Sequence, residues 1–127
     1  REACSYANAL DMTGMRKFNL LSLDLGFHCD DRYAETAPVG SYRANGFGLK
    51  DMAGNASEWA EDCHHKNYEG APTSGSAWTS KGDCSLRVIR GGSWFDFPNM
   101  VRSSTRDANP SSLRDNRIGF RVARALP

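Results

Sequence analysis

The sequence predicts an α+β domain with short strands, little helix and much ordered loop. Residues 86–90 and 118–123 alternate apolar with polar or small residues, as half-buried strands do. Helical periodicity is weak along the chain. The 127 residues include 12 glycines, with many Asn, Ser and Asp residues, and this composition indicates turns and irregular backbone. Long loops of this kind need metals, disulfides or dense side-chain hydrogen bonding to keep one shape.

The expected elements follow in chain order. The stretch "ACSYANAL" at residues 3–10 fits the end of a helix, and "TAPVGSY" at residues 36–42 fits a strand closed by Pro and Gly. The stretch "SEWAEDCHH" at residues 57–65 fits either a short helix or a strand. A long polar connection, "EGAPTSGSAWTSKGD", follows at residues 69–83. We expect the two alternating strands to pair with each other near the core.

The charge distribution is uneven, although the formal net charge is only +1. Residues 85–127 carry eight Arg and three Asp, a net charge of +5, whereas residues 1–84 carry a net charge of −4. We interpret the two parts as neutralising each other within one fold, so no nucleic-acid partner is predicted. No apolar run approaches the roughly 20 residues of a membrane span, so none is predicted.

Three stretches in this order, "TAPVGSYRANGFGLKDMAGNASEWAEDC", "RVIRGGSW" and "RIGFRVAR", resemble the formylglycine-generating enzyme (sulfatase-modifying factor) family. The resemblance spans nearly the whole chain and implies a C-type-lectin-like fold of the formylglycine-generating-enzyme type. It also implies that residues 1–127 are the C-terminal portion of a single domain, because the family's "RLPTEAEWEYA"-like helix is missing. The expected partner is therefore the missing N-terminal half or a second chain.

A half domain should expose part of its core, in keeping with the hydrophobic content of 39%. We expect this exposed apolar surface to include Ile89, Trp94, Phe120 and Val122.

The resemblance also implies two structural calcium sites. Calcium binds six to eight oxygen ligands, from carboxylates and carbonyls, at roughly 2.3–2.6 Å. The ligands of one site are the side chains of Asp51 and Glu58 with the carbonyls of Gly54 and Ala56. The ligands of the other are the side chains of Asn8 and Asp31 with the carbonyls of Ala9 and Tyr33. An ordinary turn with solvated acids is the alternative interpretation.

The catalytic residues of the family are not reproduced, and those of this chain stay unknown. Active members hold copper(I) with two cysteines shortly after the Gly-Gly-Ser, whereas here Asp96 takes the place of the first and no cysteine follows. Copper(I) prefers soft thiolates, which Asp96 and Met100 do not replace, so we expect no copper. Iron-dependent relatives use a histidine triad on the missing half, and His28, His64 and His65 do not form such a cluster.

Four widely spaced cysteines, none in a CxxC, argue against zinc. They fit two disulfides and an oxidising compartment, with free buried thiols as the alternative. Among three possible connectivities we favour Cys4–Cys29 and Cys63–Cys84, because each pair closes one loose loop of roughly 20–25 residues. We therefore expect an extracytoplasmic protein, either periplasmic or secreted.

The arginine-rich stretch after "RGGSW" predicts a hydrogen-bonding lattice, since guanidinium groups fasten loop carbonyls and carboxylates. In the implied fold, the side chains of this stretch line a ligand groove, and a mixed aromatic and polar surface suits peptide recognition. The predicted ligand-binding face is Trp94, Phe95, Asp96, Phe97, Asn99, Met100, Arg102, Arg106, Asp107, Asn109 and Arg117, with Ser112 and Asp115 beside them.

The leading hypothesis is a calcium-stabilised domain of this type that does not oxidise cysteine and binds a protein, peptide or small ligand through residues 94–117. Two alternatives stay open. One is an iron-dependent oxidoreductase with its ligands on the missing half. The other is a retroelement-diversified ligand-binding protein, in which the same "RGGSW…GFR" frame recurs.

Overall fold

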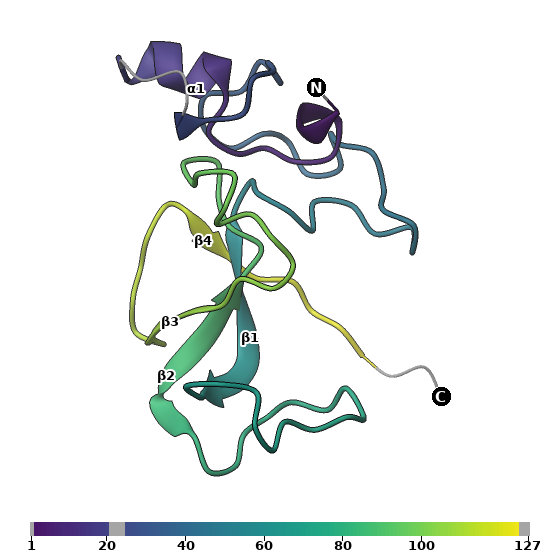
Figure 1. Cartoon of the computed structure of the whole chain (residues 1–127), viewed down its shortest axis with the longest axis vertical. Helices are drawn as coiled ribbons and strands as arrows, with labels where there is room; N and C mark the ends of the chain where they lie inside the picture. The colour runs from purple at the N-terminus through teal and green to yellow at the C-terminus, as the bar shows by residue number, and fades with distance from the viewer. Residues whose placement is uncertain (1, 21–24, 125–127) are drawn as a thin grey trace.

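The described part of the chain forms one short α-helix, a 3-10 turn and a four-stranded sheet, joined by long loops (Figure 1). The computed structural model describes residues 2–20 and 25–124. The elements are η1 (Ala3–Ser5), α1 (Met12–Lys17), β1 (Ser57–His64), β2 (Asp83–Arg90), β3 (Asp107–Pro110) and β4 (Ile118–Gly119). The predicted α+β class, with short strands and much irregular structure, is confirmed. No helix among these described residues is long and apolar enough to cross a bilayer.

The side chain of Asp11 starts α1. Its Oδ1 atom accepts hydrogen bonds from the backbone N–H groups of Thr13, at 2.8 Å, and Gly14, at 3.0 Å. These bonds satisfy two of the donors that a helix start leaves unpaired. The helix end expected at residues 3–10 is only the 3-10 turn η1, and α1 begins just beyond it. Figure 1 shows both helical segments at one end of the molecule, next to the sheet.

The sheet has the strand order β3-β2-β1-β4. β1 pairs antiparallel with β2, with Trp59 opposite Ile89, and parallel with β4, with Ser57 opposite Ile118. The expectation that the two alternating strands pair with each other is wrong, because β1 lies between them. The alternation shows that a strand has a buried face, but it does not specify the neighbouring strand. The ambiguous residues 57–65 contain β1, an inner strand.

The strand expected at residues 36–42 does not form. Gly40 adopts a φ of 80°, and the N–H of Ser41 turns back to the carbonyl of Pro38 at 3.2 Å. Proline also lacks the N–H that a strand ladder needs. The backbone of Ala37 is hydrogen-bonded to the side chain of Asn55 instead of to another strand. Asn55 Oδ1 accepts from the Ala37 N–H at 2.8 Å, and Asn55 Nδ2 donates to the Ala37 carbonyl at 3.3 Å.

Both disulfides, Cys4–Cys29 and Cys63–Cys84, are present with the favoured pairing. The first joins η1 to the loop before residue 31, and the second joins the end of β1 to the start of β2. Each closes a loop whose ends would otherwise separate, which stabilises the fold by about 3 kcal/mol in the chain-entropy model. The disulfides favour an oxidising, non-cytoplasmic compartment.

The exposed apolar surface differs from the expected one. Phe120 is 77% exposed and Val122 is 88% exposed, as expected, but Ile89 and Trp94 are buried, so that part of the expectation is wrong. Ile89 lies on the inner strand β2, and Trp94 packs against Phe18 with ring centroids 5.7 Å apart. In Figure 1 the C-terminal segment after β4 extends away from the sheet.

Candidate functional site

A groove of about 310 Å³ lies at the end of the sheet where β1 and β4 begin and β2 ends. We call it the sheet-end groove. All four strands contribute to it, together with the loops on either side of β3. It is lined by Ser57, Ile89, Arg90, Gly91, Gly92, Ser93, Asp96, Met100, Thr105, Asp107, Asn109, Leu113, Asp115, Arg117 and Ile118.

One wall of the groove is the loop after β2. The N–H and hydroxyl of Ser93 both donate to Asp96 Oδ2, at 2.8 and 2.9 Å, and the N–H of Asp96 returns to the Ser93 carbonyl at 3.1 Å. The backbone of this loop is tied to other parts of the chain. The N–H of Trp94 donates to the Asn55 carbonyl, and the N–H of Leu10 donates to the Asp96 carbonyl, both at 3.1 Å. Asp96 is therefore a structural member of the wall that also lines the groove.

The two arginines of the groove both have hydrogen-bond acceptors within the chain, and one of them is in an ion pair. Arg117 donates to both carboxylate oxygens of Asp115, at 2.8 and 2.9 Å, and this pairing holds the pKa of Asp115 down at about 2. Arg90 donates to the Ser103 carbonyl at 3.1 Å and to the Tyr68 hydroxyl at 2.8 Å. These contacts are part of the arginine lattice that the sequence predicts.

The structure gathers part of the predicted face into the groove and places the rest elsewhere. The members that line the groove are Asp96, Met100, Asp107, Asn109 and Arg117, with Asp115 beside them. The members that do not line it are Trp94, Phe95, Phe97, Asn99, Arg102 and Arg106. Ser112 also lies outside it.

The outlying members of the face have other contacts. Trp94 and Phe95 form an aromatic cluster with Phe18, which anchors the segment after α1 to the groove wall. Arg102 donates to the Asn99 carbonyl at 2.7 Å, and Arg106 stacks over Tyr68.

The predicted calcium site of Asn8, Ala9, Asp31 and Tyr33 is here called the first calcium segment, and its Asn8 is completely buried. Its Nδ2 donates to the Glu35 carbonyl at 2.8 Å and to Asn55 Oδ1 at 3.1 Å. Its Oδ1 has no hydrogen-bond partner, and among the described residues only Asp51 Oδ1 shares that condition as a buried side-chain atom. An unpaired buried oxygen costs free energy, so both atoms are unusual among buried side-chain oxygens.

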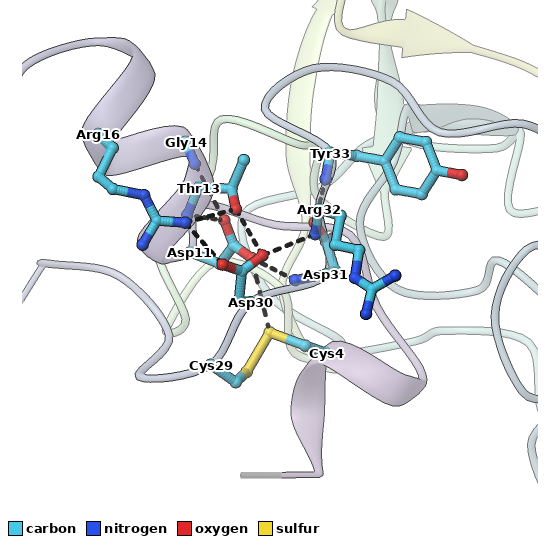
Figure 2. A network of polar contacts seen from close by, with 10 residues as sticks. All are labelled: Cys4, Asp11, Thr13, Gly14, Arg16, Cys29, Asp30, Asp31, Arg32 and Tyr33. Atoms are coloured by element: carbon cyan, nitrogen blue, oxygen red, sulfur yellow. Dashed lines mark hydrogen bonds and ion pairs between the residues drawn. A yellow bond between two sulfur atoms is a disulfide. The ribbon is translucent and has the colours of Figure 1, made fainter.

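Asp31, the carboxylate of this first segment, lies in an acidic surrounding. Its N–H donates to Asp11 Oδ2 at 2.7 Å, and its own carboxylate accepts from the Tyr33 N–H and the Tyr42 hydroxyl. Burial raises the pKa of Asp31 to about 6, and the nearby Asp11 carboxylate adds to the rise. Figure 2 shows Asp11 and Asp30 between α1 and the loop that carries Asp31 and Tyr33, beside the Cys4–Cys29 disulfide.

The predicted calcium site of Asp51, Gly54, Ala56 and Glu58 is here called the second calcium segment. It contains an arginine that the resemblance does not assign to it. Arg121 donates to both oxygens of Glu58, at 2.6 to 2.8 Å, and to the carbonyl of Asp51 at 2.8 Å. The guanidinium therefore joins Glu58 to Asp51. Asp51 Oδ2 accepts from the Gly40 N–H at 2.6 Å, which leaves its Oδ1 without a partner. Ala56 lines the same hollow as Asp51 and Glu58, and Gly54 is buried behind it.

Several residues that shape the candidate site were not predicted from the sequence. Arg90 and Leu113 line the groove, Asp11 supports both α1 and Asp31, and Asn55 ties the loop at Ala37. The "DMTG" stretch is a recognisable helix start, so Asp11 was identifiable from sequence. The role of Asn55 depends on a long-range contact, which no local pattern indicates.

The fold and the groove define a domain of the formylglycine-generating-enzyme type. The chain belongs to the family described as the sulfatase-modifying factor enzyme 1-like domain, whose model matches residues 2–126. The formylglycine-generating enzyme of Streptomyces coelicolor is 37% identical over 98 residues, which cover 74% of this chain and 31% of that enzyme. The resemblance seen in the sequence is confirmed.

Solved structures agree with this membership. PvdO from Pseudomonas aeruginosa superposes with a TM-score of 0.72 at 38% identity, over 92% of this chain and 38% of that one. Treponema denticola variable protein 1 gives a TM-score of 0.55 at 25% identity, over 76% of this chain and 34% of that one. The chain thus spans only about a third of the length of these relatives.

Proposed function

We propose that this chain is a calcium-stabilised domain that does not oxidise cysteine and that binds a protein, peptide or small ligand in the sheet-end groove. The observation that carries the proposal is Asp96. It lies in the groove wall, where its carboxylate is held by Ser93, and the resemblance puts the first copper-binding cysteine of active members at this position.

The state of the cysteines supports the non-catalytic role. All four cysteines of the sequence are in disulfides, so no thiolate is free to bind copper(I) or to engage a substrate thiol. A carboxylate is a hard oxygen ligand and does not replace a soft thiolate.

The lining of the groove supports ligand binding. Ile89, Leu113 and Ile118 provide apolar surface, and Asn109 and Asp107 add polar groups. Binding sites for small molecules and peptides combine apolar walls with a few polar groups that orient the ligand. Arg117 is paired with Asp115, and Arg90 donates to the Ser103 carbonyl and the Tyr68 hydroxyl, which favours a ligand held by shape and hydrogen bonds more than by one strong charge.

Calcium at the first segment is supported by the unpaired Asn8 Oδ1 and by the Asp31 carboxylate, which lies close to that of Asp11. Amide and carboxylate oxygens are ligands that calcium prefers. The carbonyls of Ala9 and Tyr33 would complete the protein's share. Bound calcium would supply the positive charge that this acidic surrounding lacks.

Calcium at the second segment is supported by the unpaired Asp51 Oδ1. The carbonyls of Gly54 and Ala56 would add to it. Here Glu58 would have to serve both the cation and Arg121, because its carboxylate already accepts from that guanidinium. We therefore assign the tighter calcium binding to the first segment.

The remaining part of the family domain is the proposed partner for the exposed apolar side chains. Phe120 separates two hollows, one lined also by Trp59 and Leu113 and the other by Val39 and Leu49. Val39 is 92% exposed. Burial of apolar area of this kind yields about 25 cal/mol per Å², so it favours association with the missing half or a second chain. We place the assembled protein in the periplasm or outside the cell.

Two measurements test this function. In the first, the immobilised chain selects peptides from a random display library, and the selected peptides are tested against Asn109→Trp, which fills the groove. Ser74→Trp, an exposed loop substitution, is the matched control. We expect capture by the control and loss of capture by Asn109→Trp. Equal capture by both variants would contradict groove binding.

The second measurement adds copper to the chain together with a CxPxR peptide and follows formylglycine formation by mass spectrometry. We expect no product, because no free thiol is available. Copper-dependent turnover would overturn the non-catalytic role.

A second candidate function is that of a sequence-diversified binding protein, favoured by the structural similarity to Treponema denticola variable protein 1. In that case, related copies of the gene should differ mainly at side chains between residues 94 and 117. Sequencing of such copies from one population checks this, and variation spread evenly along the chain would exclude it.

A further inference from the structure

The two disulfides of the chain differ in how far their cysteines can be reached from solvent. Of the four cysteines, all of which lie in the described residues, Cys84 alone is exposed, whereas its partner Cys63 is completely buried. Cys84 lies at the start of β2, before the point at Leu86 where pairing with β3 begins. This open part of β2 therefore gives a reagent access to one end of the bridge and hides the other end.

The Thr79 carbonyl lies against the bridge without closing the line of approach to it. Its oxygen is 3.4 Å from Cys84 Sγ and 3.7 Å from Cys63 Sγ, so it lies beside the S–S bond and not on the axis of that bond. A thiolate that attacks a disulfide approaches one sulfur from the side opposite the other and forms a mixed disulfide. For attack on Cys84, the Thr79 carbonyl does not occupy that position.

The buried sulfur has a cation beside it. Arg87 lies opposite Cys63 in the register of β1 and β2, and its Nη1 atom is 3.4 Å from Cys63 Sγ. The same nitrogen donates to the Glu61 carbonyl at 2.7 Å, which holds the guanidinium in this position. A neighbouring cation stabilises a thiolate, and a sulfur that is more stable as a thiolate leaves a disulfide faster. Cys63 is therefore the better leaving group of the pair.

The carboxylates next to the two cysteines in the sequence have other partners. Asp83 accepts from the N–H and the hydroxyl of Ser85, at 3.0 and 2.6 Å, and successive side chains of a strand point to opposite faces. The Asp83 carboxylate therefore points away from Cys84. Asp62 accepts from the Trp78 N–H at 2.7 Å. Arg87 is thus the charged group in contact with the leaving sulfur.

The Cys4–Cys29 disulfide has the opposite surroundings. Both of its cysteines are half-buried, and Asp11 Oδ2 lies 3.9 Å from Cys4 Sγ. Figure 2 shows this disulfide beside the acidic side chains near α1. A carboxylate next to a sulfur disfavours a thiolate there. This bridge should resist thiol attack under conditions that open the other one, so it provides an internal reference in the same molecule.

The strands around Cys63 and Cys84 have contacts besides the bridge. His64 lies opposite Asp83 in the register of β1 and β2, and the N–H of Cys63 donates to the Trp78 carbonyl at 3.0 Å. These contacts do not involve the sulfur atoms. They should keep the two cysteines adjacent after the S–S bond is broken, so that the same bridge can form again.

We propose that the Cys63–Cys84 disulfide is a site of reversible thiol–disulfide exchange with a dithiol reductant, in which Cys84 is the sulfur attacked and Cys63 the leaving group. One thiolate of the reductant bonds to Cys84 Sγ, the Cys63–Cys84 bond breaks, and its electron pair goes to Cys63 as a thiolate beside Arg87. The second thiolate then attacks the reductant's sulfur in the mixed disulfide and releases Cys84. The reductant is oxidised to a disulfide, and its two protons pass to the two reduced cysteines.

This site lies apart from the proposed function, because neither cysteine lines the sheet-end groove. Limited reduction of the whole folded chain tests it. Dithiothreitol is the probe, and free thiols are alkylated with N-ethylmaleimide at timed intervals and located by peptide mapping. We expect Cys63 and Cys84 to become free about tenfold faster than Cys4 and Cys29, because exposure and leaving-group stability both favour them. Equal rates, or faster opening of Cys4–Cys29, would overturn the proposal.

A monothiol shows which sulfur is attacked. With 2-mercaptoethanol as the probe and rapid alkylation, the trapped intermediate should carry the mercaptoethanol group on Cys84 and the alkyl group on Cys63. The reverse distribution would contradict the assigned roles. After dithiothreitol is removed, oxidised glutathione should restore the Cys63–Cys84 pairing, and failure to restore it would contradict the reversibility.

Arg87→Gln removes the cation and should slow reduction of the Cys63–Cys84 bridge by about threefold to tenfold, whereas Arg87→Lys should retain most of the rate. A loss of stability would have the opposite effect, because a loosened fold exposes both bridges and speeds up their reduction. Arg114→Gln is the matched control: this exposed arginine donates to carbonyls of its own loop, and its loss should leave both rates unchanged. A rate that Arg87→Gln does not lower would refute the role of the cation. A chain that captures no peptide would refute the proposed function and leave these rates unaffected.

Discussion

Asn8 and Gly54 lie backbone against backbone, although they belong to distant parts of the chain. They form a parallel bridge, and the Asn8 carbonyl accepts from the Asn55 N–H at 2.6 Å. A Cβ at position 54 would lie 1.9 Å from the Asn8 carbonyl oxygen, and Gly54 has a φ of 73°. The contact joins the two segments that we propose to bind calcium, and only glycine permits it.

Gly54→Ala should therefore destabilise the fold severely. The new methyl group would overlap the Asn8 backbone, which cannot move without breaking its bridge, so we expect a loss of more than about 3 kcal/mol in the free energy of unfolding. Urea denaturation measures it. Gly46→Ala is the matched control because a Cβ there meets nothing within 4 Å, and it should change stability by less than about 1 kcal/mol. Equal effects of the two substitutions would contradict the close contact.

Chelation should lower the melting temperature. Calcium that binds only the folded state stabilises it by about 2.7 kcal/mol when free calcium is about 100 times its dissociation constant. Calorimetry with EDTA, and then with calcium added back, measures the effect. Asp31→Asn should lose most of the response and Asp51→Asn a smaller part.

Asp30→Asn is the matched control for calcium, because Asp30 neighbours Asp31 but pairs with Arg16 and is not a proposed ligand. It should keep the full calcium response. A melting temperature that calcium does not change would remove both sites from the proposal.

The carboxylate of Asp115 should titrate with a midpoint of about 2, because Arg117 holds its pKa below the ordinary value of 3.8. A lowered pKa in the folded state stabilises the protein above the ordinary pKa, and this contribution is lost as the pH falls through the folded value. Carbon NMR of the side chain follows the titration. Arg117→Gln should move the midpoint up toward 3.8, and a midpoint unaffected by that substitution would show that the ion pair is absent in solution.

Trp94→Ala should lower the free energy of unfolding by about 3–5 kcal/mol, as large-to-small changes of buried aromatics do. Trp94 is 8% exposed and contacts both Phe18 and Phe95. Phe97→Ala, at a side chain that is 43% exposed, should cost less than about 1 kcal/mol. Thermal melts compare the two. A similar loss for both variants would contradict the burial of Trp94.

The fold class and the disulfide pairing were predictable because local features specify them. Alternation located most of β2 and all of β4, although β4 ends at Gly119 and the predicted strand ran on to residue 123, and the loop-closing logic paired Cys63 with Cys84. The position of β1 was not predictable, since Glu58, Glu61 and Asp62 give it the polarity of a surface segment. Its place as an inner strand depends on pairing with β2 and β4, which its own residues do not encode.

The candidate site was only partly predictable for a similar reason. A contiguous stretch from Trp94 to Arg117 reads as one surface, but the loop turns between them. Trp94 therefore packs toward Phe18, whereas Asp96 lines the groove. The role of Arg121 with Glu58 was missed because it joins the last strand region to the first. Contacts of this range depend on topology rather than on local pattern.

The groove wall is held by main-chain bonds: Gly54 N–H to the Gly91 carbonyl, Trp94 N–H to the Asn55 carbonyl and Leu10 N–H to the Asp96 carbonyl. These bonds join backbone atoms, so they do not depend on which side chains the loop carries. Phe97 and Met100 are exposed on this loop and do not take part in them. Substitutions at Phe97 and Met100 should therefore leave the backbone of the loop in place. A combinatorial library that varies these two positions would keep the same rigid backbone.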